Sequence, residues 1–167
     1  NMISQKIKKV KKCLLCKNNK LRSLFDLGNL YVSNFVKKKD IYKGTKSKLN
    51  LLYCNKCTLI QLSHLAPQEI MYRRFYWYKS GVTKTMREGL KELFHDCVKE
   101  AKLKRNDVVL DIGANDGTLL RYFKKRKFKT IGCEPANNLK NELKKNCNYV
   151  IDNFWSKKAL FKILDKK

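Results

Sequence analysis

The chain has 167 residues and a net charge of +25, from 39 Lys and Arg against 14 Asp and Glu. Hydrophobic residues make up 43% of it, a share typical of globular proteins. No apolar run reaches the length that crosses a bilayer, and no secretory signal is visible. These features predict a cytoplasmic protein without a membrane partner, with room for one ordinary domain and a small one.

The surplus of basic residues has two interpretations. Basic arms and RNA-binding surfaces concentrate Arg and exposed aromatic residues in local clusters. Here the excess is mostly Lys and is spread from Lys6 to Lys167. We therefore expect a solvated, lysine-rich surface of the kind that drift toward AT-rich codons produces. Nucleic acid stays open as an alternative partner, and a substrate with phosphates would benefit from the charge in either case.

Two C-x-x-C pairs carry the first motif. Cys13 and Cys16 form one pair, and Cys54 and Cys57 form the other after a long insert. Two such pairs can present four thiolates to one zinc ion in a tetrahedron. Four thiolates leave no open coordination position, so we predict a structural zinc site in a module over residues 13–66. Four buried cysteines without a metal are the alternative.

The segments around the cysteines indicate a small β-rich module. Strands are predicted at residues 24–30, 49–53 and 59–62, and residues 1–12 form a basic arm ahead of them. The metal would replace a hydrophobic core that so small a module cannot build.

A linker over residues 67–105 follows. It contains four consecutive aromatic residues at 75–78, interpreted either as packing between domains or as the lining of a cleft. It also contains an amphipathic helix at 83–102, whose apolar face should cover a sheet. That face is predicted to consist of Met86, Leu90, Leu93, Cys97 and Ala101, widened by Phe94 and Val98.

The most informative stretch covers residues 108–117 and is VVLDIGANDG. Its apolar first half predicts a strand buried on both faces, and its glycines predict a loop before a helix. A strand, a glycine loop and a helix open a nucleotide-binding βαβ unit. The pattern continues with helices at 117–127, 135–146 and 156–167 and strands at 130–134 and 149–151.

The glycine loop favours S-adenosylmethionine (SAM) over a dinucleotide. A dinucleotide fingerprint needs glycine at the positions of Asn115 and Thr118, where backbone approaches a pyrophosphate. SAM has no phosphate and tolerates a side chain there. We predict that Asp111 faces the cationic part of the methionine and that Glu134 accepts both ribose hydroxyls. The predicted cofactor-binding residues are Asp111, Gly113, Asn115, Gly117, Glu134, Asn153 and Phe154, with Asp152 beside the last two.

The predicted fold class is α/β. A small zinc-stapled, β-rich N-terminal module precedes an incomplete Rossmann-like SAM-binding domain at residues 106–167, with its first three strands. The strand at 108–112 should have one unpaired edge. A glycine loop in an unrelated α/β domain is the alternative.

The combined motifs resemble SAM-dependent C-methyltransferases of the deoxysugar type, which methylate a carbon of nucleotide-linked keto-sugars. The resemblance implies a zinc module, a SAM-binding domain, a further C-terminal domain and a nucleotide-sugar substrate. It also implies Tyr76 and Tyr78, in the tyrosine-rich segment, as catalytic candidates. The motifs that carry it are both cysteine pairs, LFDLG at 24–28, LIQL at 59–62, YKSG at 78–81, VLDIGANDG at 109–117 and GCEP at 132–135.

The resemblance implies an in-line displacement, in which the enolate carbon of a deprotonated keto-sugar attacks the SAM methyl group. The family's later segment with histidine and glutamate, which handles the sugar proton, has no counterpart in these 167 residues. We therefore expect a fragment that binds SAM at best and does not turn over. Two alternatives stay open: a zinc-containing RNA methyltransferase, and a non-catalytic module that binds zinc and SAM.

Overall fold

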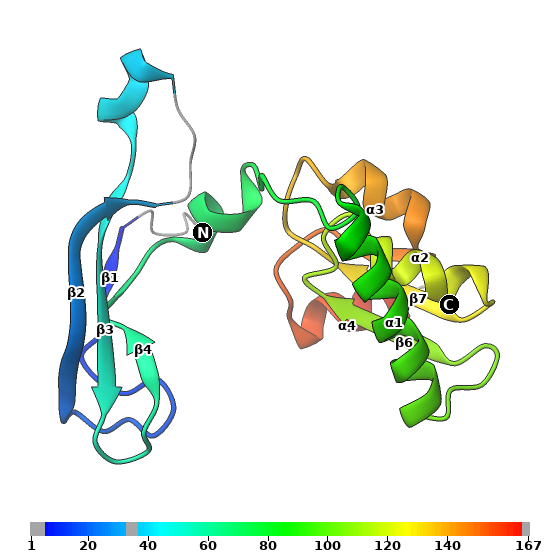
Figure 1. Cartoon of the computed structure of the whole chain (residues 1–167), viewed down its shortest axis with the longest axis horizontal. Coiled ribbons are helices and arrows are strands. Elements are labelled where there is room, and N and C mark those ends of the chain that lie inside the picture. Colours follow the sequence, from blue (N-terminus) through cyan, green and yellow to red (C-terminus); the bar gives the residue numbers. More distant parts are fainter. Residues whose placement is uncertain (1–5, 33–36, 165–167) are drawn as a thin grey trace. The chain divides into compact units, whose positions relative to one another are not determined.

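The computed structural model of the chain describes residues 6–32 and 37–164 and divides into two compact units (Figure 1). Unit 1 covers Asn1–Met71 and unit 2 covers Tyr72–Lys167. The boundary falls inside a short π-helical turn, η2 (Glu69–Arg73). Most of the segment predicted as a linker therefore belongs to unit 2. No helix in the described ranges is long and apolar enough to cross a membrane.

Unit 1 is built on a three-stranded antiparallel sheet in the order β2–β3–β4 (Figure 1). Each strand predicted from the sequence is present, and β2 and β3 are longer than predicted. A second pair of strands consists of β1 and β5. Because β1 lies within the predicted basic arm, part of that arm is folded. The elements are β1 (Lys8–Lys9), β2 (Leu21–Tyr31), η1 (Lys38–Lys43, a 3-10 helix), β3 (Lys46–Cys54), β4 (Ile60–Leu62) and β5 (His64–Leu65).

The sheet of unit 1 buries little apolar surface. Pairing places Phe25, Leu51 and Leu62 on one face, where Phe25 is 57% exposed. The buried positions of the sheet include polar residues such as Asn50, which accepts a hydrogen bond from Ser23 at 2.9 Å. Among the described residues of this unit, the buried aliphatic, aromatic and cysteine side chains are Val10, Cys13, Cys54 and Pro67.

Unit 2 has a parallel three-stranded sheet in the order β6–β7–β8, with a helix after each strand and one before the first (Figure 1). The mixed α/β class and the three predicted strands are confirmed. The last predicted helix extends to residue 167, and its residues 165–167 lie outside the described part. The elements are α1 (Lys84–Glu100), β6 (Val108–Ile112), α2 (Thr118–Lys125), β7 (Lys129–Cys133), α3 (Lys140–Asn146), β8 (Tyr149–Ile151) and α4 (Lys157–Leu164).

The burial of β6 differs from its prediction. Val108 and Ile112, at its two ends, are 53% and 54% exposed, so the strand is not buried on both faces. The reason is its position: β7 occupies the centre of the sheet and β6 one edge. Within the described ranges no strand pairs with the outer side of β6, which confirms the predicted unpaired edge.

The buried face of α1 is also rotated from the predicted one. Met86 and Leu93 are 37% and 45% exposed, whereas Phe94 is buried. Phe94 packs edge-on against Phe123 of α2 at a centroid distance of 4.8 Å, and Phe123 packs against Phe128 at 5.7 Å. The helix therefore covers α2, and the aromatic side chains determine which face is buried.

Two glycines of unit 2 should respond oppositely to alanine. Gly117 has φ +76°, and a Cβ there would lie 2.8 Å from Asn146 Cβ. Gly117→Ala should lower the free energy of unfolding by about 1–3 kcal/mol, through left-handed strain and overpacking. Gly89 lies inside α1 with open space around its Cα, so Gly89→Ala should raise that free energy by about 0.5–1 kcal/mol. Urea denaturation measures both, and a stabilising Gly117→Ala would contradict this packing.

Candidate metal centre and cofactor loop

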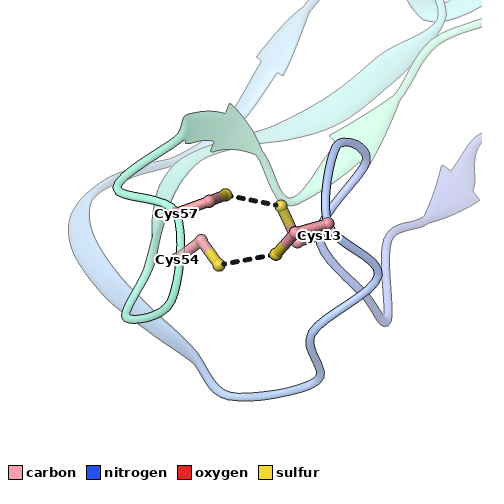
Figure 2. A group of neighbouring side chains, drawn as sticks. Cys13, Cys54 and Cys57 are labelled. Atoms are coloured by element: carbon pink, nitrogen blue, oxygen red, sulfur yellow. Dashed lines mark hydrogen bonds between the residues drawn. The ribbon is translucent and has the colours of Figure 1, made fainter.

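The four cysteine sulfurs of unit 1 converge on one point, and Figure 2 shows Cys13, Cys54 and Cys57 around it. All four Sγ atoms lie within 4.8 Å of one another. The Cys13–Cys57 and Cys16–Cys54 sulfur pairs are each 3.5 Å apart. A zinc ion bound at about 2.3 Å by four thiolates sets neighbouring sulfurs roughly 3.8 Å apart. The four residues therefore fit a tetrahedral zinc site.

The two cysteine pairs lie on two separate tight turns that have the same geometry. The carbonyl of Cys13 accepts the amide of Lys17 at 3.0 Å, and the carbonyl of Cys54 accepts that of Thr58 at 2.9 Å. Lys17 and Thr58 have φ +63° and +62°, the left-handed region that favours glycine. Two turns with one geometry thus hold the four sulfurs from both sides.

The surroundings of the four sulfurs shift the pKa values of Cys54 and Cys57 in opposite directions. The backbone amide of Cys57 lowers the pKa of Cys54 to about 6, against the effect of burial. The backbone amide of Lys56 and the side-chain amide of Asn18 act in the same direction as Cys57. The amide of Leu59 favours the Cys57 thiolate, but burial and the neighbouring sulfurs raise the pKa of Cys57 to about 12. A bound divalent cation would favour the thiolate form of the four sulfurs, because coordination requires deprotonated cysteine.

The glycine loop of unit 2 is held in left-handed conformation at three positions. Gly113, Asn115 and Gly117 have φ +83°, +53° and +76°. A Cβ on Gly113 would meet nothing within 4 Å, so this position leaves room for a ligand against the backbone. A Cβ on Gly117 would instead collide with Asn146 of α3. Gly117 therefore serves the packing of α3, and its predicted contact with the cofactor stays a prediction.

The predicted ribose acceptor, Glu134, is 7% exposed and already bonded to the loop. Its two carboxylate oxygens accept the amides of Asn115 at 3.0 Å and Ala136 at 2.8 Å. Each oxygen keeps a second lone pair, so its role toward ribose hydroxyls stays a prediction. Burial, and then the negative charge of Glu134, raise the pKa of Asp111. The same causes, together with Asp111, raise the pKa of Cys133 to about 11.

The remaining predicted cofactor residues follow β8. Arg73 donates a hydrogen bond to Asn153 Oδ1, and its guanidinium lies 5.2 Å from the centroid of the Phe154 ring. Asp152 forms an ion pair with Lys140. The carbonyl of Asn153 accepts the thiol of Cys133 at 3.3 Å, which ties this segment to the end of β7.

The catalytic candidates lie in an irregular segment of the same unit. The backbone of Tyr76 is bonded to the Asn138 side chain, and the carbonyl of Tyr78 accepts the Asn115 side chain at 3.0 Å. The structure thus brings Tyr78 next to a predicted cofactor residue from a distant part of the sequence. Tyr78 itself is 48% exposed.

Sequence reasoning missed several residues that support these sites. Asp116 accepts the amide of Thr118 at 3.0 Å in an Asx turn just before α2, and Asp in a glycine loop is a recognisable signal for such a turn. Gln61 is buried and accepts the amide of Leu14 at 2.9 Å, which fixes the first cysteine turn. Nothing in a strand sequence marks one glutamine as buried, so this contact had no signal.

These two sites define a zinc-binding module and a parallel α/β unit with a glycine loop. Residues 13–72 match the family Methyltransf_13, described as "Putative zinc binding domain". C-methyltransferase NovU of Streptomyces niveus is 23% identical over 135 residues, which cover 80% of this chain and 32% of that protein. The chain thus spans about a third of the length of this curated relative. The predicted resemblance is confirmed as a similarity: the chain is similar to a C-methyltransferase over most of its length, and its residues 13–72 match a zinc-binding domain.

The metal assignment predicts a sharp contrast between cysteine variants. Purified protein should contain about one zinc ion per chain, measured by atomic emission. Cys54→Ala removes a ligand and should abolish stoichiometric binding. Cys97→Ala, in α1, should leave the zinc content unchanged, because Cys97 packs with apolar neighbours. Equal loss of zinc from both variants would refute the four-cysteine site.

The left-handed backbone of Thr58 predicts that glycine at this position increases the stability of the protein. Thr58→Gly relieves a β-branched residue at φ +62° and should raise the free energy of unfolding of zinc-loaded protein by about 1 kcal/mol. Lys56→Gly, in the same turn but without a positive φ, should lower it because glycine adds freedom to the unfolded chain. Chemical denaturation at saturating zinc measures both, and destabilisation by Thr58→Gly would contradict the turn geometry.

Proposed function

We propose that this chain serves a SAM-dependent methyltransferase whose acceptor is a carbon of a nucleotide-linked keto-sugar. The observation that carries the proposal is the similarity to a C-methyltransferase over 80% of the chain, which reaches beyond residues 13–72 of the zinc-binding domain. The zinc site has a structural role, since four thiolates leave no position for water or substrate.

The residues of unit 2 suit SAM at the carboxyl ends of β6 and β7. Ligands of parallel α/β sheets bind in that location. Gly113 offers open backbone there, and Asp111 and Glu134 supply carboxylates on neighbouring strands. When bound, SAM supplies an electrophilic methyl group. The chain's own contribution is to hold that cofactor in orientation and to keep water from it.

The acceptor requires removal of a proton next to a carbonyl. Tyr76 and Tyr78 are the phenols of this chain that we assign to the acceptor side, where a tyrosine can orient a keto group or relay a proton. The net charge of +25 favours a substrate with phosphates. None of the seven cysteines forms a disulfide, which suits the cytoplasm.

A methyltransferase that acts on RNA is the second candidate. The same +25 charge is the observation that favours it. The similarity to a C-methyltransferase favours the sugar acceptor.

Calorimetry with S-adenosylhomocysteine, the demethylated product of SAM, tests the cofactor assignment. We expect this ligand to bind and NAD not to bind. Glu134→Ala removes the ribose acceptors and should weaken the affinity roughly 5- to 150-fold, equivalent to about 1–3 kcal/mol. Glu88→Ala, on the exposed surface of α1, is the matched control and should leave it unchanged.

An unchanged affinity in Glu134→Ala would remove that residue from the site. Competition then separates the two acceptors. A nucleoside diphosphate sugar should bind more tightly when S-adenosylhomocysteine is present, and a single-stranded RNA should not. The reverse result would favour the RNA methyltransferase.

A further inference from the structure

The segment of residues 76–81, named here the tyrosine segment, has no regular secondary structure and contains both catalytic candidates. Within the described ranges, neither Tyr76 nor Tyr78 uses its phenol oxygen in a hydrogen bond, so both hydroxyls are available to a ligand. The backbone of the segment, in contrast, is bonded along most of its length. Its position is therefore set by other residues of unit 2.

Asn115 holds the middle of the tyrosine segment. Its side-chain oxygen accepts the amide of Ser80 at 3.0 Å, and its side-chain nitrogen donates to the carbonyl of Tyr78 at 3.0 Å. The residue is 7% exposed, and its own amide donates to Glu134 at 3.0 Å. One buried side chain thus connects the glycine loop, the predicted ribose acceptor and a catalytic candidate. Because the Asn115 side chain is buried, its amide group has these backbone partners in place of water, and the bonds restrain the segment.

Asn138 holds the first residue of the segment in the same way. Its side-chain oxygen accepts the amide of Tyr76 at 2.9 Å, and its side-chain nitrogen donates to the carbonyl of Tyr76 at 3.0 Å. The pair imitates the two bonds that one residue makes to a neighbouring strand. The two bonds therefore fix the backbone of Tyr76, and its ring lies 6.0 Å from that of Tyr72 between centroids.

The end of the segment is closed by Asp116 and Gly81. The Asp116 carboxylate accepts the amide of Gly81 at 2.8 Å. A Cβ on Gly81 would lie 2.6 Å from Thr118 Oγ1 and 2.9 Å from Asp116 Oδ2. Only glycine permits this approach to the start of α2. The ion pair of Lys79 with Glu142, at 2.7 Å, adds a further contact to α3.

We propose that Asn115 and Asn138 are positioning residues that fix the tyrosine segment against the cofactor loop. Ligand binding at the loop stiffens Asn115 and, through its two side-chain bonds, the backbone between Tyr78 and Ser80. The cofactor site and the acceptor side are thereby coupled without a contact between cofactor and tyrosine. The role of the tyrosines in this proposal rests on the proposed function. The side-chain hydrogen bonds of Asn115 and Asn138 to the segment, named here the two clamps, do not depend on it.

Hydrogen exchange on the full chain tests the clamps. Asn115→Gly tolerates the left-handed backbone and removes both bonds, so exchange of the Ser80 amide should quicken about tenfold, the equivalent of one hydrogen bond. Asn115→Asp keeps the acceptor for Ser80 and loses only the donor to Tyr78, and it should largely restore slow exchange. Asn138→Gly should quicken the Tyr76 amide by a similar factor. Asn137→Gly, at the next position, should leave both amides at their original rates.

The fluorescence of Trp77 supplies a signal that global stability would not move. In a Trp155→Phe background, Trp77 is the one tryptophan of the chain and lies inside the segment. Its anisotropy should fall in Asn115→Gly and Asn138→Gly at temperatures where far-UV circular dichroism shows unit 2 folded. Saturating S-adenosylhomocysteine should raise the anisotropy in the parent and not in Asn115→Gly.

Unchanged exchange and anisotropy in both clamp variants would overturn the proposal. If the clamp variants change exchange and anisotropy, but S-adenosylhomocysteine does not raise the anisotropy of the parent, the coupling is overturned. If that ligand fails to bind at all in calorimetry, the proposed function fails, and the exchange of the ligand-free variants still decides whether Asn115 and Asn138 position the segment.

Discussion

Four thiolates that converge on one point hold unit 1 together, because this unit has almost no hydrophobic core. Its described residues bury the apolar side chains of Val10, Pro67 and two of the cysteines, while the three apolar clusters found within the described ranges lie in unit 2. A sheet with one open apolar face and a polar buried side cannot offset the conformational entropy of its long insert. The metal supplies the missing free energy, and the two left-handed turns place its ligands.

Unit 2 depends instead on hydrogen bonds between side chains and backbone groups that lie far apart in the sequence. Glu134 fixes the glycine loop through two amides, and Asn115 and Asn138 fix the tyrosine segment through its carbonyls and amides. These residues belong to the ends of strands and the starts of helices, where backbone groups lack partners. Residues predicted from the sequence to bind a cofactor, Asn115 and Glu134, therefore also support the backbone around them.

The sequence predicted local features well and spatial ones less well. The spacing of the cysteines predicted which four sulfurs the structure brings together, and apolar periodicity located the strands and helices within a few residues. Periodicity does not report the order of strands, so the exposed ends of β6 were predicted as buried. Helical spacing allowed several faces of α1, and the Phe94–Phe123 contact selected one. The bond from Asn115 to Tyr78 joins positions far apart in the chain, and no local pattern encodes it.

The long insert between the cysteine turns has a consequence for biosynthesis. A ribosome delivers Cys13 and Cys16 first, and these two thiols alone cannot complete a tetrahedral site. Until β3 and the second turn emerge, β2 has no partner, and its exposed Phe25 and Leu27 are open to non-native strand pairing. The nascent chain therefore passes through an interval in which the four-sulfur site cannot yet form and β2 has no neighbour, so both cysteine turns must be synthesised before unit 1 reaches its native fold.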